Sequence, residues 1–366
     1  MVQPKTAVTS IPEDVLVSVV VLNYNNKELL AQSLVSVLDQ DWPKLEVIVV
    51  DNCSTDGSPE MVAKQFGERV RVIRRTVNSP TAGRNQGFEA ATGAYILSID
   101  NDITLPDRGV VRKGVGLFQQ FPRVGVLAFK VGTSESPNEP LPEHWWYSRP
   151  LDTWKNRFFY TDFFSEGAVL FRSKTLVTSG GYDDKLFQYF ESVDLSLRLI
   201  RDGFEMLYCP VLACVELRVR GLLPKKRTRI NYLSLRNRLW IVWKHYPFWR
   251  GLRFAVGRVA IACLRSVRYG WVDYFLRGER RAMRKLIAEI FDPATRYEYE
   301  LPLPSDIARA LELDAKFPQL ELGLTDGTVA AVAERRRIYR VLTTDRRDFS
   351  AIRIGPRLSR ALELLP

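Results

Sequence analysis

Short apolar runs alternate with helix-patterned segments along the N-terminal part of this 366-residue chain. Apolar side chains recur at helical spacing within Lys27–Gln40, and two further helices are expected at Pro59–Phe66 and Arg84–Ala91. Strands that alternate with helices predict βαβ units, a mainly parallel sheet and right-handed crossovers. The runs typical of buried strands are Val17–Leu22, Leu45–Val50, Val70–Arg74, Tyr95–Ile99 and Val124–Phe129.

The predicted fold class is therefore α/β, with a Rossmann-like nucleotide-binding half. Asn25 or Asn26 is a suitable N-cap for the first helix, and Trp42-Pro43 would end it. The chain carries neither the G-x-G-x-x-G dinucleotide fingerprint nor the G-x-x-x-x-G-K-[ST] phosphate loop. The sequence thus argues against a dehydrogenase and against a P-loop enzyme.

Two of the strand-like runs end abruptly in carboxylates. Asp51 ends the second run, and Asp100-Asn101-Asp102 follows the fourth. Ligands of open α/β sheets bind beyond the carboxyl ends of the strands, and a period of two sends Asp100 and Asp102 to one side. Such paired oxygen ligands suit Mg²⁺ or Mn²⁺ bridging a nucleotide diphosphate, while Asp51 can accept a hydrogen bond from a pyrimidine N3–H. The sequence therefore predicts a nucleotide-and-metal site.

Two patterns near these acids have simpler interpretations. Asp39-Gln40-Asp41 repeats the spacing of the two carboxylates at a helix end, so only the position after a strand favours a metal at Asp100 and Asp102. Ser54–Gly57 has the composition of an ordinary turn, and the sequence leaves a turn and a ligand-binding loop equally open.

The net charge of +11 is unevenly placed. Residues 201–285 hold 20 Lys/Arg against 5 Asp/Glu, a net of +15, and the rest of the chain sums to −4. This concentration indicates an anionic partner such as a membrane surface, a diphosphate or a nucleic acid; the alternative is a solvated basic face. If Arg250–Arg268 is one helix, its arginines gather on one side and its apolar residues on the other, which fits a helix lying among lipid headgroups or one packed on the catalytic domain.

Cysteine and terminal patterns bound the cellular setting. The four cysteines form no C-x-x-C pair, and only two histidines accompany them, which argues against a zinc site and a disulfide framework. No apolar signal-peptide core occurs before Asp14, and Val15–Leu22 is too short to span a bilayer. A cytoplasmic location is expected, and peripheral attachment to the inner face of the membrane is compatible with it.

Six motifs in the region of residues 15–245 resemble the family 2 glycosyltransferases in type, order and spacing. The pattern V-D-N-x-S-x-D-G-S is most similar to the rhamnosyltransferase-like branch. The resemblance implies a GT-A fold and an inverting transfer from a dTDP- or UDP-linked sugar to a hydroxyl of a glycan or lipid-linked acceptor, in cell-wall or polysaccharide biosynthesis. The motifs are Val17–Asn25 (VSVVVLNYN), Val50–Ser58 (VDNCSTDGS), Arg84–Gly87 (RNQG), Leu97–Ile103 (LSIDNDI), Gly180–Asp184 (GGYDD) and Tyr189–Arg198 (YFESVDLSLR).

The resemblance also implies roles for residues at matching positions. Asp102 would be the direct ligand of Mg²⁺ or Mn²⁺, and Asp100 would lie between the ribose and the metal shell. Asp51 would contact the base, and Arg84 and Asn85 would lie near the ribose or diphosphate. The positions expected at the nucleotide are Asn23, Asp51, Arg84, Asn85 and Asp100.

The catalytic base is where the chain departs from this family. The usual E-D-x-D stretch reads Glu191-Ser192-Val193-Asp194, so the second acid has become Ser192. Glu191 is the preferred base and Asp194 the second choice; alternatively, both acids only favour the helix dipole. A relative that binds the donor without turnover follows if Ser192 removes the base.

Other aromatic and ionisable residues receive provisional roles. Many relatives place a His after the base helix, but Val211–Gly221 has none; Glu216 is the acid there, and Lys225-Lys226-Arg227 could act on the phosphates instead. His144 and His245 are expected to be structural. Trp145-Trp146-Tyr147 is expected in the core rather than against a sugar.

The C-terminal part is predicted to be separate. Asp292–Pro304 has the composition of a linker, and Leu322–Glu334 and Tyr339–Phe349 resemble the C-terminal half of PIN-domain ribonucleases, with Asp326 and Asp345 matching two nuclease acids. This resemblance and the basic segment make a nucleic-acid-binding or nuclease-related protein the alternative function. Because the other half of the PIN domain has no counterpart in the chain, nucleic acid is not the expected partner. The predicted organisation is a GT-A domain (1–245), a basic helical segment (246–291), a linker (292–304) and a PIN-like fragment (305–366).

Overall fold

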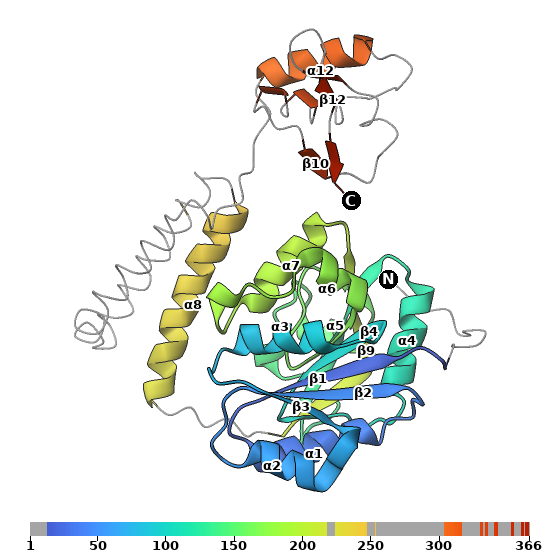
Figure 1. Ribbon diagram of the computed structural model, residues 1–366, viewed down its shortest axis with the longest axis vertical. Coiled ribbons are helices and arrows are strands. Elements are labelled where there is room, and N and C mark those ends of the chain that lie inside the picture. Colours follow the sequence, from blue (N-terminus) through green and yellow to red (C-terminus); the bar gives the residue numbers. More distant parts are fainter. Residues whose placement is uncertain are drawn as a thin grey trace. The chain divides into compact units, whose positions relative to one another are not determined.

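The computed structural model describes residues 13–217, 224–246 and 253, and, further along, residues 304–316, 330–331, 334–335, 340–342, 353–354, 360–361 and 363–365. The chain forms two compact units, Met1–Thr295 and Arg296–Pro366 (Figure 1). The basic stretch Arg250–Arg268 (except Arg253), the linker before Pro304, and Asp326 and Asp345 lie outside the described residues. Their predicted roles stay predictions.

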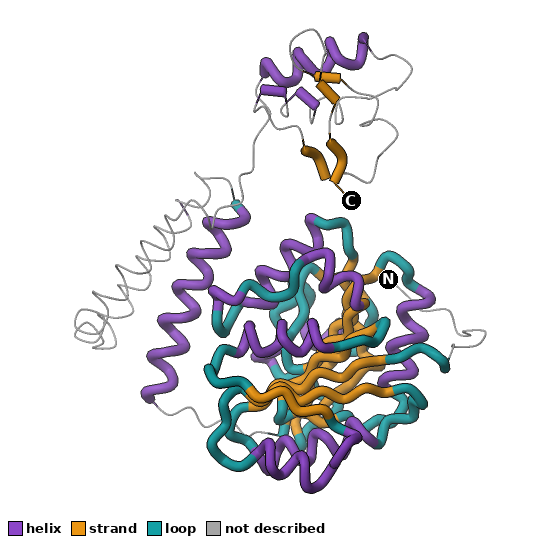
Figure 2. The backbone as a smooth tube through the Cα atoms, in the orientation of Figure 1, coloured by secondary structure: helices purple, strands orange, loops and turns teal. Residues whose placement is uncertain are grey.

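The first unit is built around a nine-stranded sheet with helices on both faces (Figure 2). Its strand order is β3-β2-β1-β4-β8-β6-β9-β5, and β7 pairs with β9. The strands are β1 (Val17–Asn23), β2 (Leu45–Asp51), β3 (Arg71–Arg74), β4 (Tyr95–Asp100), β5 (Ile103–Thr104), β6 (Val124–Thr133), β7 (Phe159–Thr161), β8 (Ala168–Arg172) and β9 (Glu205–Glu216). Among its described residues, the α-helices of this unit are α1 (Lys27–Leu38), α2 (Ser58–Phe66), α3 (Pro80–Ala90), α4 (Val110–Gln120), α5 (Leu151–Trp154), α6 (Ser173–Ser179), α7 (Glu191–Arg201) and α8 (Pro224–His245).

The pairing of the strands changes across the sheet. β3, β2, β1 and β4 run parallel, whereas β8 is antiparallel to both of its neighbours, β4 and β6. β6 and β9 are again parallel. The predicted α/β class and largely parallel first half are confirmed, and the five predicted strand runs all form strands. The antiparallel insertion of β8 was not predicted, because its run is short and carries no distinguishing periodicity.

The two faces of the sheet explain why its central strands are apolar throughout. Side chains such as Val19 and Val21 join a core with α1, α2 and α4, whereas Val20 joins a core with α3, α6 and α7. A strand covered on both faces needs apolar residues at successive positions, so it reads as a continuous run. The result is a helix–sheet–helix sandwich whose carboxyl strand ends are left for the site.

Helix boundaries follow local chemistry. α1 begins after Asn26, as predicted, although Asn26 makes no side-chain cap bond. α3 begins at Pro80, four residues before the predicted start, since proline is favoured in the first turn of a helix. Residues Ser54–Gly57 form a bend between β2 and α2, and Asp56 accepts hydrogen bonds from the backbone N–H groups of Lys27 (2.9 Å) and Ser58 (3.0 Å). The bend thus fixes the starts of α1 and α2.

The second unit contains α12 (Pro304–Lys316) and two short strand pairs. β10 (Arg340–Leu342) pairs in parallel with β13 (Glu363–Leu365), and β11 (Arg353–Ile354) pairs antiparallel with β12 (Arg360–Ala361). Leu313 of α12 is buried, and Arg309 forms an ion pair with Glu334. Among the described residues of both units, no helix combines the length and apolar character needed to cross a membrane.

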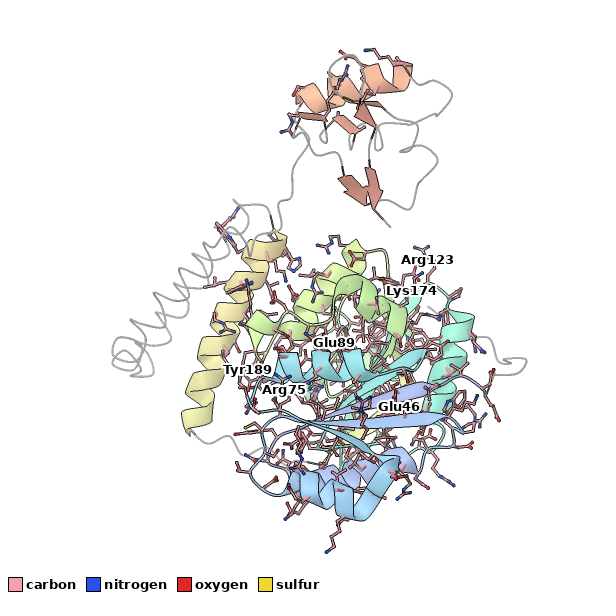
Figure 3. The ribbon with its side chains drawn as sticks, in the orientation of Figure 1. Glu46, Arg75, Glu89, Arg123, Lys174 and Tyr189 are labelled. Atoms are coloured by element: carbon pink, nitrogen blue, oxygen red, sulfur yellow. The ribbon has the colours of Figure 1, made fainter. Side chains whose placement is uncertain are left out.

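The close approach of α3 to the sheet gives a stability prediction. A Cβ at Gly87 would lie 2.4 Å from Val20 Cγ1 and 3.0 Å from Val50 Cγ2. We expect Gly87→Ala to destabilise the protein by about 1–3 kcal/mol, because an added methyl group overpacks this contact. Urea denaturation measures the change. Glu89→Ala on the exposed side of the same helix (Figure 3) is the control, and an equal loss there would contradict the packing argument.

Candidate active site

Three predicted residues meet at the carboxyl edge of the sheet. In the parallel register, Asn23 lies opposite Asp51, and Leu22 lies opposite Asp100. β1 thus runs between the two strands whose acidic ends were predicted to form a site. Asn23 and Asp51 are buried, with 0% and 2% of their surface exposed.

A chain of hydrogen bonds fixes the Asp51 carboxylate. Asn23 Nδ2 donates to Asp51 Oδ1 (2.9 Å), and the backbone N–H of Ser54 donates to Asp51 Oδ2 (3.0 Å). Asn101 Nδ2 in turn donates to Asn23 Oδ1 (2.7 Å). Each carboxylate oxygen can accept a second hydrogen bond, so a base N–H could still be received in a fixed direction. Asn101 was not predicted to act here, because its connection to Asn23 spans 78 positions.

Arg84 is a buried cation beside Asp100. Its guanidinium forms an ion pair with the Asp100 carboxylate, donates to Ser98 Oγ (3.3 Å) and is 5% exposed. Burial alone would lower the pKa of Arg84, but the negative charge of Asp100 outweighs it and raises that pKa. Arg84 is therefore a permanent positive charge at the strand ends.

The Asn85 side chain bonds to a different segment from that of its neighbour Arg84. Its Nδ2 donates to the carbonyl of Tyr182 (2.8 Å) and to Asp184 Oδ1 (2.7 Å), and its Oδ1 accepts from the N–H of Tyr182 (2.8 Å). Gly181 has a φ of +68°, and a Cβ there would lie 2.6 Å from Asn85 Oδ1. The Asn85 side chain thus ties α3 to the GGYDD segment, and its expected contact with the nucleotide stays a prediction.

Asp102 adjoins the end of β9. Its carbonyl accepts from the N–H of Leu217 (2.8 Å), and the next residue, Ile103, pairs with Glu216. His144 reaches Glu216 Oε2 through Nε2 (2.9 Å) and Ser165 Oγ through Nδ1 (2.7 Å). A histidine therefore does lie at this strand end, although it comes from before the base helix, and its spacing gave no signal of this. Within the described part of the chain, no three His, Cys, Asp or Glu side chains form a ready-made metal cluster.

Glu191 has a carboxyl partner that the sequence did not indicate. Glu191 is the first residue of α7 and is 4% exposed, and the nearby Glu166 carboxyl affects its pKa. Glu166 precedes β8, and the adjacent Gly167 carbonyl accepts from the Asp100 N–H (3.1 Å). Two carboxyl groups can hydrogen bond only if a proton lies between them. A lone acid before a short apolar run, 25 positions from Glu191 in the chain, gave no motif that could have found it.

The electrostatics of this pair agree with one shared proton. Burial raises the pKa of Glu166 well above its ordinary value, and the neighbouring charge of Glu191 raises it further. Burial also raises the pKa of Glu191, while the hydrogen bond from Glu166 and the charge of Arg84 oppose that rise. Burial raises the pKa of both carboxyls, so the pair favours holding one proton between them.

Asp194, the second candidate base, is engaged elsewhere. It is fully buried, its Oδ1 contacts Lys244 Nζ (2.9 Å) and His245 Nε2 (2.7 Å), and its Oδ2 accepts from Arg198 Nε (2.9 Å). Burial alone would raise the pKa of Asp194, but the His245 hydrogen bond and the Arg198 and Lys244 charges hold it well below its usual range. These contacts join α7 to α8, which makes a stabilising role for Asp194 more consistent with the geometry than proton transfer.

The aromatic triplet is divided between core and surface. Tyr147 is buried against Phe159 and Tyr208, and Trp145 packs on the same rings, as expected. Trp146 instead is 51% exposed, so the expectation that it lies in the core is not met. Trp146 packs against Phe163 and Phe190.

The Asp194 network gives a pH-dependent prediction. We expect Asp194→Asn to lose about 3–5 kcal/mol of unfolding free energy at pH 7, because Lys244 and Arg198 lose a buried counter-charge. The folded pKa of Asp194 is lowered, so this stabilisation is present above pH of about 4 and disappears as pH falls further. Urea denaturation at pH 7 and again at about pH 3, roughly one unit below the ordinary Asp pKa of about 3.9, should show the difference from wild type shrinking. Asp39→Asn, in an exposed pair with Arg108, should change stability by less than about 1 kcal/mol.

Comparison with known proteins shows similarity to glycosyltransferases. Residues 18–177 match the model of glycosyl transferase family 2. The putative teichuronic acid biosynthesis glycosyltransferase TuaG of Bacillus subtilis is 39% identical over 90 residues, which cover 24% of this chain and 36% of that protein. The putative glycosyltransferase EpsE of the same species is 28% identical over 203 residues, which cover 51% of this chain and 68% of that protein.

The structural comparison is more distant. A mannosyltransferase, PcManGT from Pyrobaculum calidifontis, solved with GDP-Man and Mn²⁺, has a TM-score of 0.49 at 18% identity, covering 91% of this chain and 90% of that one. The chain spans between 16% and 36% of the length of the first three curated relatives that it matches. The fold is of the GT-A type that the motifs predicted, a mostly parallel α/β sheet with flanking helices.

Proposed function

We propose that this chain, which contains a glycosyl transferase family 2 domain, is an inverting glycosyltransferase that uses a nucleotide-diphosphate sugar. The observation that carries the proposal is the juxtaposition of Asn23, Asp51 and Asp100 at the carboxyl ends of three adjacent parallel strands. Ligands of open α/β sheets bind at such an edge. The proposed biological setting is cell-wall or polysaccharide biosynthesis, in keeping with the names of the relatives.

The donor is proposed to lie with its base at Asp51 and its diphosphate towards Asp100 and Asp102. Asp51 is held by Asn23 and Ser54 in one orientation and can accept the N3–H of uracil or thymine, which favours UDP- or dTDP-sugars. The buried Arg84 cation lies next to Asp100, where it would meet the ribose or the diphosphate. A positive charge fixed in advance stabilises phosphate charge without having to reorganise.

The carboxylates fit a divalent ion of the Mg²⁺ or Mn²⁺ class. Such ions are commonly held by one or two carboxylates and complete their shell with substrate phosphates and water. Asp102 would be the direct ligand, and Asp100 would be secondary because its carboxylate already pairs with Arg84. When bound, the ion supplies Lewis-acid stabilisation of charge on the departing diphosphate.

Glu191 is the proposed base. In an inverting transfer, the acceptor oxygen bonds to the anomeric carbon as the bond from that carbon to the diphosphate breaks. The acceptor hydroxyl proton passes to the Glu191 carboxylate, and the diphosphate leaves with the bonding electrons. Glu166 is the neighbouring carboxyl with which Glu191 would share a proton before the acceptor binds. Asp194 is not favoured, because the Arg198 and Lys244 cations and the His245 ring already occupy its carboxylate.

The acceptor and the membrane surface are proposed only by their chemical class. A glycan or lipid-linked hydroxyl is the proposed acceptor, and contact with an anionic inner membrane surface is proposed from the basic composition of residues 201–285. The rhamnosyltransferase-like branch is proposed from the V-D-N-x-S-x-D-G-S pattern. The family match ends at residue 177, so the PIN-like resemblance of the tail stays a separate prediction.

Donor binding is the first test. We expect isothermal titration to show binding of UDP or dTDP, but not GDP, and to show it only with Mn²⁺ or Mg²⁺ present. Asp102→Ala should weaken binding at least about tenfold, because a metal ligand is lost. Asp41→Ala, in the D-x-D-spaced pair at the end of α1, is the matched control and should bind normally. Failure of all three diphosphates to bind would contradict the proposed function.

Turnover is the second test. Glu191→Gln should release nucleoside diphosphate from the preferred donor at least about 100-fold more slowly, because a general base contributes this much. Donor affinity should stay within about twofold of wild type, because the nucleobase of the donor is proposed to bind at Asp51, away from Glu191. Glu89→Gln, on the exposed side of α3, is the control. Wild-type turnover by Glu191→Gln would exclude this residue as the base.

A further inference from the structure

The loop that leads into Glu191 has an unusual backbone. Phe187, Tyr189 and Phe190 have φ values of +64°, +71° and +67°. Residues with a Cβ rarely adopt this left-handed region, and three of them within four positions persist only where surrounding contacts enforce them. Phe190 immediately precedes Glu191, so its backbone angles set the direction in which α7 begins and the position of the Glu191 carboxyl.

One buried side chain of α8 gathers the carbonyls of this loop. Asn237 is 0% exposed, and its Nδ2 donates to the carbonyl oxygens of Leu186 (3.0 Å), Gln188 (2.9 Å) and Tyr189 (2.6 Å). An amide group has two hydrogens, so the three carbonyls share them. Three backbone carbonyls of the loop therefore converge on one side-chain amide (Figure 3 marks Tyr189 on the side towards α8).

Neighbouring residues of α8 reinforce this contact. Arg236 donates to the carbonyl oxygens of Lys185 (3.1 Å) and Leu186 (2.7 Å), and the Arg238 guanidinium lies 4.6 Å from the centre of the Phe190 ring. Further along the helix, Lys244 binds Asp183 (2.8 Å), on the other side of the loop. α8 is thus attached to the loop at several points, and Asn237 is the central one.

We propose that Asn237 is a positioning residue, which holds the loop Leu186–Phe190 in its left-handed conformation and thereby places the Glu191 carboxyl at the site. This inference rests on the proposed function of Glu191 as base. It extends the active site to α8, which lies beyond the residues that match the family model. Asn237 acts through its two N–H groups rather than through its volume, and this distinguishes positioning from packing.

Kinetics test the catalytic consequence. Asn237→Asp keeps the shape but replaces the donors with a carboxylate that repels the three carbonyls. We expect its kcat to fall about 100-fold, the effect of displacing a catalytic group by roughly 1 Å, with KM for the donor and the Kd of the nucleotide diphosphate unchanged. Ser234→Ala, on the same helix, should leave kcat at the wild-type value.

A second variant separates the loop conformation from general damage. Asn237→Ala should also lower kcat, and adding Phe187→Gly should restore part of that loss, because glycine adopts positive φ without strain. A wild-type kcat in Asn237→Asp would overturn the inference. The inference would also be overturned if both Asn237 variants lost kcat and donor affinity to the same extent and adding Phe187→Gly restored neither.

Hydrogen exchange tests the structural part independently of activity. In Asn237→Asp, the amides of Phe187 and Gln188, which donate to Asp184 and Leu186, should exchange faster, while those of β1 and β2 should not change. Unchanged exchange in the loop would overturn the inference. If wild type binds no nucleotide diphosphate but the loop loses protection as expected, the proposed function fails and the loop contact stands.

Discussion

The close seating of α3 on the sheet is the constraint on which the rest of the site depends. Gly83 and Gly87 flank Arg84 and Asn85, and a Cβ at Gly83 would lie 2.8 Å from Leu22 Cδ1, as one at Gly87 would meet Val20. Without these side chains the helix approaches β1 closely enough for Arg84 to reach the end of β4. The motif R-N-Q-G is thus explained by packing as much as by chemistry, since its glycine brings its arginine to the strand ends.

Arg84 then sets the charge balance of three carboxyl groups. Its ion pair with Asp100 neutralises one of them, which leaves Glu166 and Glu191 to face each other in a buried place. Two buried carboxylates cannot both remain charged at short range, so one holds a proton. Asp194, one turn further along α7, shows the opposite outcome, because Arg198, Lys244 and His245 surround it and keep it ionised. Environment, rather than residue type, separates these acids into different roles.

The fold and half of the site could be predicted because their signals are local. Apolar runs identified β1, β2 and β4, and the acids that follow them identified Asp51 and Asp100. The remaining contacts join distant positions through the sheet: Glu166 with Glu191, His144 with Glu216, and Asn237 with Leu186. No spacing rule relates such pairs, since β8 and β9 enter the sheet out of sequence order. Asn85 shows the same limit, because its motif suggested a ligand contact while the fold gives its side chain the GGYDD segment as partner.

Ser192 is the departure from the family pattern, and the structure suggests why it is tolerated. A serine at the second position of α7 is 6% exposed and brings no charge, so the proton-accepting role would fall on a carboxylate that differs from the usual one by a single residue. One residue along a helix turns a side chain by 100°, and a base must lie within hydrogen-bond distance of the acceptor hydroxyl. A base at Glu191 therefore needs the start of α7 to be held in a particular orientation. The positive-φ residues before α7 and the Asn237 amide that binds their carbonyls are contacts that would impose this orientation.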